Sequence, residues 1–572
     1  MRSSNGCWTC RLRRKKCDEN YPVCAGCSAL DITCHYQDEK PEWMDAGVKQ
    51  DEMAECVKRE VKEKARLRRE GGYQVHTSSD PMVSSHDSPT ERTCPVSNLL
   101  ETNTIQPSPE PPTLWLQHGA RSTYSCQGAP ESMTLKRSEA VLFTFYLETL
   151  FPFLFPFYRP SYLQGGRAWV LEMIISRPVV RQAILCQSVY FFSLAQGTAT
   201  DCDLDWEKVL SQTGDAFGVL RQALQVMDGS GIANHLHGAV RTMSSIMQLQ
   251  RFEIAILSFH NWQAHLNAAL ALFRQLLDSV LERGEPRTKF GAVMSHLGLS
   301  LLSRSWSGPG DQVPSAEQAA FRFSSALVIF DDIIASAVLQ TQPRLYEYHR
   351  SLLGNIEGTS EPIVDLEPIV GLKNWTLLQI GEISTLDAWK QQCIAAGNLD
   401  VVELVRRATV IKESLTTYLA RVDTDPARFS IEKSSILDVF APPICQGSFV
   451  TRVWTHAALI YLSTVVSGWQ PANSDVRCNV NQIIELLLKG QISPALLRTM
   501  AWPFCVAGCL AEPAQEVQFR GIVELLQPPS FFGTIHKAFE IMQNVWRHRG
   551  VDGANHDIAA CFKTGNDVVL LV

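Results

Sequence analysis

Six cysteines crowd into residues 7–34 of this 572-residue chain, although the whole chain has only 17. Their spacing is C-x2-C-x6-C-x6-C-x2-C-x6-C, so an x2-x6 pattern occurs twice. A Cys-x2-Cys turn lets two thiolates meet one metal ion, and a third thiolate then arrives after a short segment. The spacing therefore predicts a metal cluster that involves all six residues: Cys7, Cys10, Cys17, Cys24, Cys27 and Cys34.

The number of sulfurs sets the number of ions. Structural Zn²⁺ takes four ligands, so two ions held by six sulfurs require two bridging thiolates. The symmetric choice of bridges is the first cysteine of each half, Cys7 and Cys24. Two Zn²⁺ ions are then expected, and their two ligand sets are Cys7, Cys10, Cys17 and Cys24 for one ion and Cys7, Cys24, Cys27 and Cys34 for the other.

Clustered cysteines have two other common uses in proteins, disulfides and other zinc modules. Three disulfides would need an oxidising compartment, but residues 1–6 lead straight into the cysteines without an apolar secretory segment. The chain is therefore expected to be intracellular, where thiols stay reduced. A RING-type or zinc-ribbon interaction module would need a different spacing, usually with histidine.

A basic run separates Cys10 from Cys17. Five of its six residues are cationic, and we expect them on a short helix that ends at a metal ligand. A cationic helix pinned on a rigid two-metal core suits the major groove of DNA. A basic run of this kind can also be a solvated face or a nuclear import signal. The candidate DNA contacts are Arg11, Arg13, Arg14, Lys15 and Lys16.

At these residues the chain resembles the fungal Zn(2)-Cys(6) binuclear-cluster transcription factors. The stretch from Cys10 to Asp18 is similar to that family's basic helix, and Tyr21-Pro22-Val23-Cys24 is similar to its inter-half loop. The resemblance implies a nuclear regulator of RNA polymerase II transcription that reads CGG-like triplets in double-stranded DNA. It implies base contacts for Arg13 and Arg14, where the family often has lysine, and phosphate contacts for Arg11, Lys15 and Lys16.

Composition divides the chain into four zones. Residues 1–36 form the DNA-binding module, and 37–70 form a charged helical linker or basic segment. Residues 71–135 are rich in Ser, Thr and Pro, which predicts a disordered linker. Residues 136–572 carry apolar residues at helical spacing and form the regulatory zone.

The charged zone contains a weak apolar seam. Met53, Val57, Val61 and Ala65 step by four residues, which drifts around a helix instead of keeping the 3.5-residue period of a coiled coil. We therefore expect a solvated, DNA-proximal or import-signal helix here, and a homodimer stays an open alternative.

The long last zone predicts helix after helix. In His260–Arg283, eight apolar residues from Leu266 to Leu281 fall on one face. The fold class is therefore mainly α: a small two-zinc module, a disordered linker and a large all-α regulatory domain, built as a stacked array or two lobes. Further helices are expected at about 136–150, 178–196, 205–227, 235–250, 287–304, 315–337, 383–395, 399–420, 449–467, 479–489, 493–511 and 531–547.

Two segments extend the family resemblance into this zone. Residues 145–158, rich in Phe and Pro, resemble the start of the fungal-specific regulatory domain, and residues 501–509 resemble its later Trp-Pro helix. The aromatic run is expected to pack in the core rather than to line a ligand pocket. Asp331-Asp332 is interpreted as a charged helix edge, and Cys505 and Cys509 as buried thiols.

The net charge of −7 at first argues against a nucleic-acid partner. The charge is segregated, however: residues 1–36 carry six basic and three acidic residues, and residues 49–69 carry eight and five. No common catalytic motif occurs in a suitable context, so we expect no enzyme, and no membrane partner is expected. The expected partners are promoter DNA, the transcription machinery and, as an open alternative, a small-molecule effector. A zinc module that serves mainly protein contacts is the competing interpretation.

Overall fold

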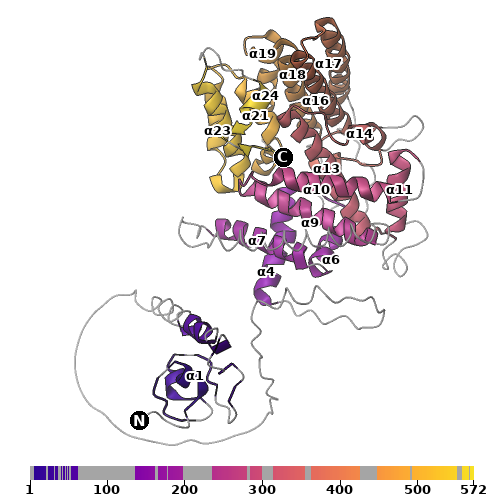
Figure 1. The fold of residues 1–572 in the computed structure, drawn as a ribbon. Coiled ribbons are helices and arrows are strands. Elements are labelled where there is room, and N and C mark those ends of the chain that lie inside the picture. The colour runs from indigo at the N-terminus through magenta and orange to yellow at the C-terminus, as the bar shows by residue number, and fades with distance from the viewer. Residues whose placement is uncertain are drawn as a thin grey trace, which may run out of the picture. The chain divides into compact units, whose positions relative to one another are not determined.

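Apolar residues at helical spacing form most of the secondary structure in the part of the chain that the computed structural model describes (Figure 1). This part divides into two compact units, Met1–Ser125 and Cys126–Val572. The predicted linker at 71–135, the predicted helix at 205–227 and Arg14 lie outside the described residues. The described residues are 6–13, 15–20, 23–30, 32–35, 40–41, 43–44, 47, 49–50, 53–61, 136–161, 165–176, 178–196, 235–279, 284–298, 313–354, 362–424, 447–489, 493–549, 557–565 and 567–572.

The first unit contains the cysteine cluster. Two short helices, α1 (Trp8–Leu12) and α2 (Ala25–Ser28), each follow the first cysteine of a Cys-x2-Cys turn. Residues 53–61 form a further helix. These pieces share a small core of their own, which contains Ile32 and Val57 together with the cysteines.

The second unit has one connected hydrophobic core that runs from Phe143 to Leu571. Its first half contains α4 (Arg137–Phe145), the π-helix η3 (Tyr146–Leu150), α5 (Phe151–Leu154), α6 (Ala168–Ser176), α7 (Pro178–Ala195), α9 (Leu236–Ala255), α10 (Trp262–Asp278), α11 (Pro286–His296), α13 (Ala316–Leu339), α14 (Tyr346–Leu353) and α15 (Glu367–Val370). Its second half contains α16 (Asn374–Ala395), α17 (Val401–Thr424), α18 (Gly447–Ser467), α19 (Ser474–Lys489), α20 (Pro494–Arg498), α21 (Ala501–Cys509), α22 (Glu516–Glu524), the 3-10 helix η8 (Pro529–Phe532), α23 (Gly533–Arg547) and α24 (Ile558–Cys561).

Helix α13 lies at the centre of this unit. It begins with a capping box, in which the Gln318 amide donates to the Ser315 hydroxyl at 3.1 Å and the Ser315 amide donates to the Gln318 side chain at 3.0 Å. Nearly all its side chains are buried, because α9, α10, α6 and α16 pack around it. The helices then continue in layers, with α16 against α17 and α18, α18 against α19 and α21, and α21 against α23 (Figure 1). The mainly α prediction is therefore confirmed, in the form of a stacked array with one core.

The structure corrects several predicted boundaries. The expected helix at 493–511 is divided into α20 and α21, because Pro503 lacks an amide hydrogen and its ring would clash with the Thr499 carbonyl in a continuous helix. Helix α16 begins at Asn374, well before the expected residue 383. The sequence interpretation missed α6, α14 and α22, and it missed a hairpin of β1 (Lys563–Thr564) and β2 (Asp567–Val568).

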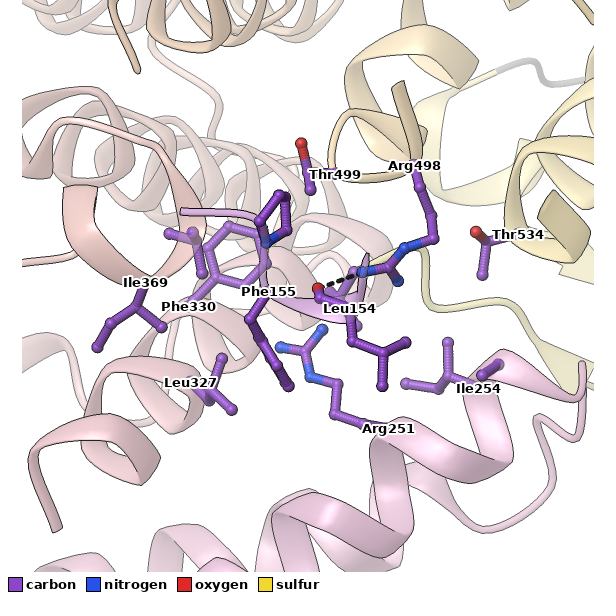
Figure 2. Close-up of a pocket in the computed structure, with 14 residues that line it drawn as sticks. Leu154, Phe155, Arg251, Ile254, Leu327, Phe330, Ile369, Arg498, Thr499 and Thr534 are labelled. Atoms are coloured by element: carbon purple, nitrogen blue, oxygen red, sulfur yellow. Dashed lines mark hydrogen bonds between the residues drawn. The ribbon is translucent and has the colours of Figure 1, made fainter. Parts of the chain in front are cut away.

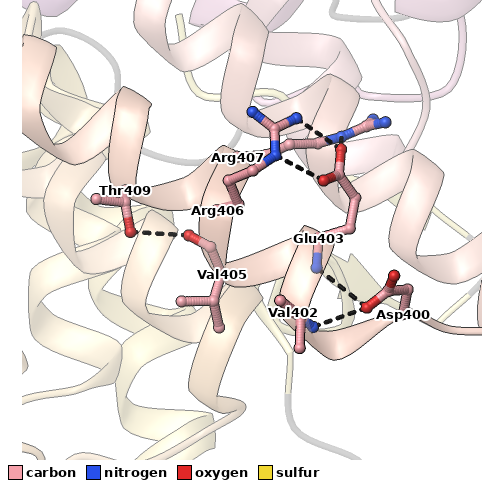
Figure 3. Close-up of polar contacts among 7 residues, drawn as sticks. All are labelled: Asp400, Val402, Glu403, Val405, Arg406, Arg407 and Thr409. Atoms are coloured by element: carbon pink, nitrogen blue, oxygen red, sulfur yellow. Dashed lines mark hydrogen bonds and ion pairs between the residues drawn. The ribbon is translucent and has the colours of Figure 1, made fainter.

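Helix α17 shows how local polar residues start a helix on the surface of this unit (Figure 3). Asp400 caps it by accepting hydrogen bonds from the amides of Val402 at 2.9 Å and Glu403 at 3.1 Å. Glu403 then accepts from Arg406 and Arg407, at 2.7 and 2.6 Å. These two hydrogen bonds lower the pKa of Glu403 to about 2.

Helix α18 is the one helix, among the described residues, with the length and composition of a membrane span. Its most apolar window is 78% buried inside the unit. Its side chains pack against α16, α17, α19 and α21, which is the environment of a core helix.

Candidate metal centre and nucleic-acid interface

The two halves of the cysteine cluster have the same local structure. Cys7 caps α1, and its sulfur accepts a hydrogen bond from the Cys10 amide at 3.3 Å. Cys24 caps α2 in the same way, with the Cys27 amide at 3.4 Å from its sulfur. Amide donors of this kind favour the thiolate form, which is the form that binds metals. The repeated x2 spacing in the sequence therefore corresponds to a repeated cap in the structure.

The six sulfurs gather into two groups of four. One group contains Cys7, Cys10, Cys17 and Cys24, the other contains Cys7, Cys24, Cys27 and Cys34, and within each group the sulfurs lie within 4.8 Å of one another. Cys7 and Cys24 belong to both groups. Five of the six side chains are buried, and Cys34 is half-buried.

The sulfur separations suit a tetrahedral zinc ion. A Zn–S bond of about 2.3 Å places neighbouring sulfurs of a tetrahedron about 3.8 Å apart. Within the groups, the Cys7 and Cys24 sulfurs are 3.7 Å apart, Cys10 and Cys24 are 3.6 Å apart, and Cys7 and Cys27 are 3.9 Å apart. The donor set and its spacing therefore fit Zn²⁺, and the two groups coincide with the ligand sets expected from the sequence. Which ions they hold, and how many, stays a prediction.

Burial and mutual contact shift the pKa values of the clustered thiols in opposite directions. Burial raises the pKa of Cys7 and Cys27, and it raises the pKa of Cys10 to about 11. Burial also acts to raise the pKa of Cys24, but hydrogen bonds from the Cys27 amide and from neighbouring thiols outweigh it and lower this pKa to about 6. One thiolate is thus stabilised at the expense of its neighbours, and a bound cation would favour the thiolate form of those neighbours.

A buried threonine holds the two ends of the module together. The Thr9 hydroxyl donates to the Thr33 carbonyl at 2.9 Å and accepts from the His35 amide at 3.0 Å. Beside it, the Trp8 amide donates to the His35 carbonyl at 2.8 Å. The segment that ends in Cys34 is therefore fastened to α1, although nothing in the spacing of the cysteines indicated a role for Thr9.

The helix at residues 53–61 packs on the cysteine module. Val57 is only 3% exposed and belongs to the same small core as the cysteines, while Met53 and Val61 pack against that core. The Glu60 carboxylate accepts from both the amide and the hydroxyl of Thr33, each at 2.8 Å. The apolar seam with four-residue steps, which does not suit a coiled coil, thus packs against the cysteine module within this unit.

The basic segment is less helical than the sequence suggested. Helix α1 ends at Leu12, Arg13 is its C-cap, and Lys15 and Lys16 lie beyond it in irregular structure. A continuous helix would carry Cys17 about 10 Å along its axis from Cys10. Their sulfurs lie within 4.8 Å of each other, so the chain must leave the helix and turn back.

The candidate DNA contacts differ in exposure. Lys15 and Lys16 are exposed, and Arg13 is half-buried. The Arg11 guanidinium lies 4.5 Å from the centre of the Trp8 ring, in a cation–π contact that fixes its direction. Arg14 is outside the described residues. Among the described candidates, Lys15 and Lys16 are therefore the cations most accessible to a partner.

The paired aspartates and the paired cysteines that the sequence singled out, Asp331-Asp332 and Cys505 with Cys509, are all buried in the helical unit. Asp331 and Asp332 are buried, so the interpretation as a charged helix edge was wrong: Asp331 pairs with Arg251, and Asp332 accepts from the amides of Arg344 and Leu345. Adjacent residues point in different directions on a helix, but both directions here lead into packed neighbours. The Cys505 and Cys509 thiols are buried, 4.0 Å apart.

Comparison with known proteins gives the family of both parts. Residues 5–43 match the model of the Fungal Zn(2)-Cys(6) binuclear cluster domain. Residues 141–570 match the model of the Fungal specific transcription factor domain. The chain belongs to the fungal-specific transcription factor family. Its zinc-cluster module and its helical unit are therefore parts of a transcription factor with a binuclear-cluster DNA-binding domain, and not of an enzyme.

Three relatives of this transcription factor match it over 89–99% of both chains. Transcription factor dibT of Pestalotiopsis microspora is 34% identical, and the match covers 99% of each chain. Pestheic acid cluster transcriptional regulator 3 of Pestalotiopsis fici is 28% identical over 90% of this chain and 89% of its own. The ustiloxin B cluster transcription factor ustR of Aspergillus flavus is 26% identical over 96% of this chain and 94% of its own. No solved structure matches the chain significantly.

Proposed function

We propose that this transcription factor binds promoter DNA through a cluster of two Zn²⁺ ions and reads CGG-like triplets with the basic segment that follows α1. The observation that carries the proposal is the pair of four-sulfur groups that share Cys7 and Cys24 and frame the basic residues. Zn²⁺, when bound, would supply the positive charge that keeps the six thiolates deprotonated and fixes their geometry.

We assign some basic residues of the module to base contacts and the others to phosphate contacts. Arg13 and Arg14 are assigned to base edges, because a guanidinium can donate two parallel hydrogen bonds to guanine O6 and N7. Lys15 and Lys16 are exposed point charges suited to phosphates. Arg11 is also assigned to a phosphate, and its contact with Trp8 would hold it in place for that role.

A mobility-shift assay with zinc-loaded protein tests the metal dependence. The wild-type chain should bind a CGG-containing duplex and bind it less well when the triplet is scrambled. Cys17→Ala removes one sulfur from a four-sulfur group and should abolish the specific complex. Cys56→Ala is a matched control, because Cys56 is exposed and outside both groups. Equal binding by Cys17→Ala and Cys56→Ala would refute the proposal.

Two further variants test the division between bases and phosphates. Arg14→Ala should lose about 1–3 kcal/mol of preference for CGG over the scrambled duplex. Lys15→Ala should weaken binding to both duplexes alike and reduce the slope of log K against log salt by about 0.9. The assignment fails if both variants change specificity and salt dependence equally.

We also propose that the genes under control form a secondary-metabolite cluster and that the protein acts in the nucleus. The first part is supported by the relatives, two of which are named as regulators of the pestheic acid and ustiloxin B clusters, and the second part by the family. Drug resistance is the competing role. Genome-wide mapping of binding sites, with transcript levels after deletion of the gene, decides between them: sites confined to transporter genes elsewhere in the genome would contradict a cluster-specific role.

A further inference from the structure

The helix at residues 53–61 has one apolar side, and its own cysteine module covers that side. Val57, in the middle of the helix, is only 3% exposed and lies in the small core that contains the cysteines. Met53 and Val61, about one turn before and after Val57, pack against the same core. Together with Ala65, these residues are the seam that a coiled-coil dimer would use, so the seam is occupied within a single chain.

A carboxylate fastens the helix in this docked position. The Glu60 side chain accepts hydrogen bonds from the Thr33 amide and from the Thr33 hydroxyl, each at 2.8 Å. Glu60 follows Val57 by three residues, so the two side chains are neighbours on the helix surface. Hydrogen bonds to an ionised acceptor are stronger than neutral ones. Pairing with a second copy through this seam would therefore require the loss of both hydrogen bonds and of the buried contacts of Val57.

The exposed side of the same helix is mostly charged. Its exposed residues are Glu55, Cys56, Lys58 and Arg59, and the Lys58 ammonium donates to the Glu55 carboxylate at 2.6 Å. Three charged residues out of four do not form a second apolar seam. The helix can therefore dock on its own module or pair with a second copy, but it cannot do both at once.

The spacing of the seam suits docking better than pairing. Successive residues of an α-helix lie about 100° apart, so each step of four residues moves the seam by about 40° around the helix. From Met53 to Val61 the drift is about 80°, which stays within the apolar stripe of an ordinary packed helix. A coiled coil needs a seam that stays in line for about three to four heptads. A seam that drifts at this rate would leave the interface before then.

Docking also keeps two positively charged segments of the chain in one small unit. Residues 1–36 carry six basic and three acidic residues, and residues 49–69, which include the docked helix, carry eight and five. The electrostatic part of DNA binding grows with the number of phosphates that a protein neutralises. In a dimer, the second copy adds such charges. Here a second basic segment is attached to the first within one chain.

We propose that the protein reads one CGG-like triplet as a monomer, with the helix at 53–61 docked on its own cysteine module in place of a second copy. The inference rests on the proposed reading of such triplets and adds the number of chains that a site holds. A dimer with a fixed separation between its modules needs two half-sites at a set spacing. A monomer needs one triplet, and the distance to the next triplet does not matter.

A mobility-shift assay with two forms of the full zinc-loaded chain counts the copies on DNA. One form is untagged, the other carries a large fused tag, and both are mixed on a short duplex that holds a single CGG triplet. Two shifted bands, one for each form, are expected. A third band between them would show two copies on one duplex and would overturn the proposal. If a scrambled duplex is bound equally well, the reading of triplets is refuted, while the number of bands still gives the number of copies. No binding to any duplex would overturn both proposals.

Duplexes with two triplets test the independence of the sites. Affinity for such a duplex should exceed that for a single triplet by only about twofold, the statistical factor for two independent sites, at every spacing and orientation. An affinity at least tenfold higher at one particular spacing would show that two linked modules bind together, and the monomer would be excluded.

A pair of charge-matched variants tests the docked helix. Glu60→Ala removes both hydrogen bonds to Thr33, and it should weaken binding to one-triplet and two-triplet duplexes by the same factor, at least threefold. Glu55→Ala removes the same charge from the exposed side of the helix and should cause no such loss. Tighter binding of Glu60→Ala to the two-triplet duplex, as expected if a freed helix pairs with a second copy, would overturn the proposal. Equal affinities of the two variants would overturn it as well. If Glu60→Ala does not fold, the band count on the wild-type chain still decides.

Discussion

A single hydroxyl group joins the two ends of the zinc-cluster module. Thr9 is fully buried and makes two hydrogen bonds, to the Thr33 carbonyl and from the His35 amide. Thr9→Val keeps the shape and removes both, which leaves two backbone groups unsatisfied and costs about 1–3 kcal/mol. We expect zinc affinity, measured by competition with a chelator, to fall by about tenfold, whereas Thr9→Ser should behave like the wild type. Equal affinities of the Val and Ser variants would show that the hydroxyl is not needed.

A buried carboxyl group in the helical unit, that of Asp331, makes the free energy of unfolding depend on pH. Burial raises the pKa of Asp331 to about 6, against the lowering influence of Arg251. The folded state therefore holds this proton more tightly than the unfolded state, and the contribution of Asp331 to stability falls as the pH rises through about 4 to 6. Asp331→Asn removes the titration. Between pH 5 and 7, urea unfolding should show the wild type losing about 1.4 kcal/mol relative to this variant. A difference that does not change with pH would contradict the expectation.

These residues show what a linear sequence reveals and what it hides. The six cysteines were found because their spacing is local and repeated, and a short segment brings all of them together. The contacts of Thr9, and of Arg498 with the Leu154 carbonyl (Figure 2), were not found, because the partners lie 24 and more than 340 residues away. Asp331-Asp332 was misinterpreted for the same reason: Arg251, which compensates Asp331, is 80 residues away and lies on another helix.

At the level of elements, the helix at 53–61 behaves as part of the module. Val57→Ala removes two buried methyl groups, which costs about 1.6 kcal/mol of docking free energy. Undocking exposes the backbone after Lys58 and Arg59, so trypsin should cleave there roughly tenfold faster in the variant. Cys56→Ala, at an exposed neighbouring position, should be cleaved at the wild-type rate. If Val57 served a coiled coil instead, the variant would change the dimer fraction in mass photometry and leave cleavage of the monomer unchanged.

The end of α15 depends on a glycine for two separable reasons. Gly371 has φ +74°, which disfavours a side chain, and a Cβ there would lie 2.3 Å from the Phe157 ring. Gly397 has φ +68° with nothing within 4 Å, so Gly397→Ala measures the backbone cost alone. Gly371→Ala should be more destabilising than Gly397→Ala by about 1–3 kcal/mol, because the rigid ring must move. Equal losses in thermal unfolding would mean that the ring yields without cost.

The helices themselves were largely predictable, since amphipathic spacing is a local signal. Helix boundaries were predicted wrongly in two situations. In one, a single residue interrupts the amphipathic pattern, and in the other, a helix is buried on several sides and has no amphipathic pattern. Pro503 divides one expected helix in two, and the first half of α16 is buried on several sides, which removes the contrast between polar and apolar faces. The docking of residues 53–61 was not predictable, because a seam shows that a face is apolar without showing what covers it.

At the level of the whole molecule, the excess of positive charge is confined to two short segments near the N-terminus. Residues 1–36 and 49–69 are each net +3, against −7 for the entire chain, so the remainder is net −13. The buried hydrophobic residues form two separate cores, one in each unit. The negative remainder is spread over several zones: residues 37–48 are net −3, residues 70–135 are net −5 and residues 136–572 are net −5. Attraction to DNA is thus concentrated in the two short basic segments.

Two separate cores predict that metal removal affects one unit only. A strong chelator should unfold the zinc-cluster module, because its small core contains the cysteines themselves, and specific DNA binding should be lost. The helical unit has its own connected core, so most of the far-UV helical signal and its thermal unfolding transition should remain unchanged. Adding zinc back should restore DNA binding without changing that transition. A large loss of helical signal on chelation would instead show that the helical unit needs the metal-bound module in order to fold.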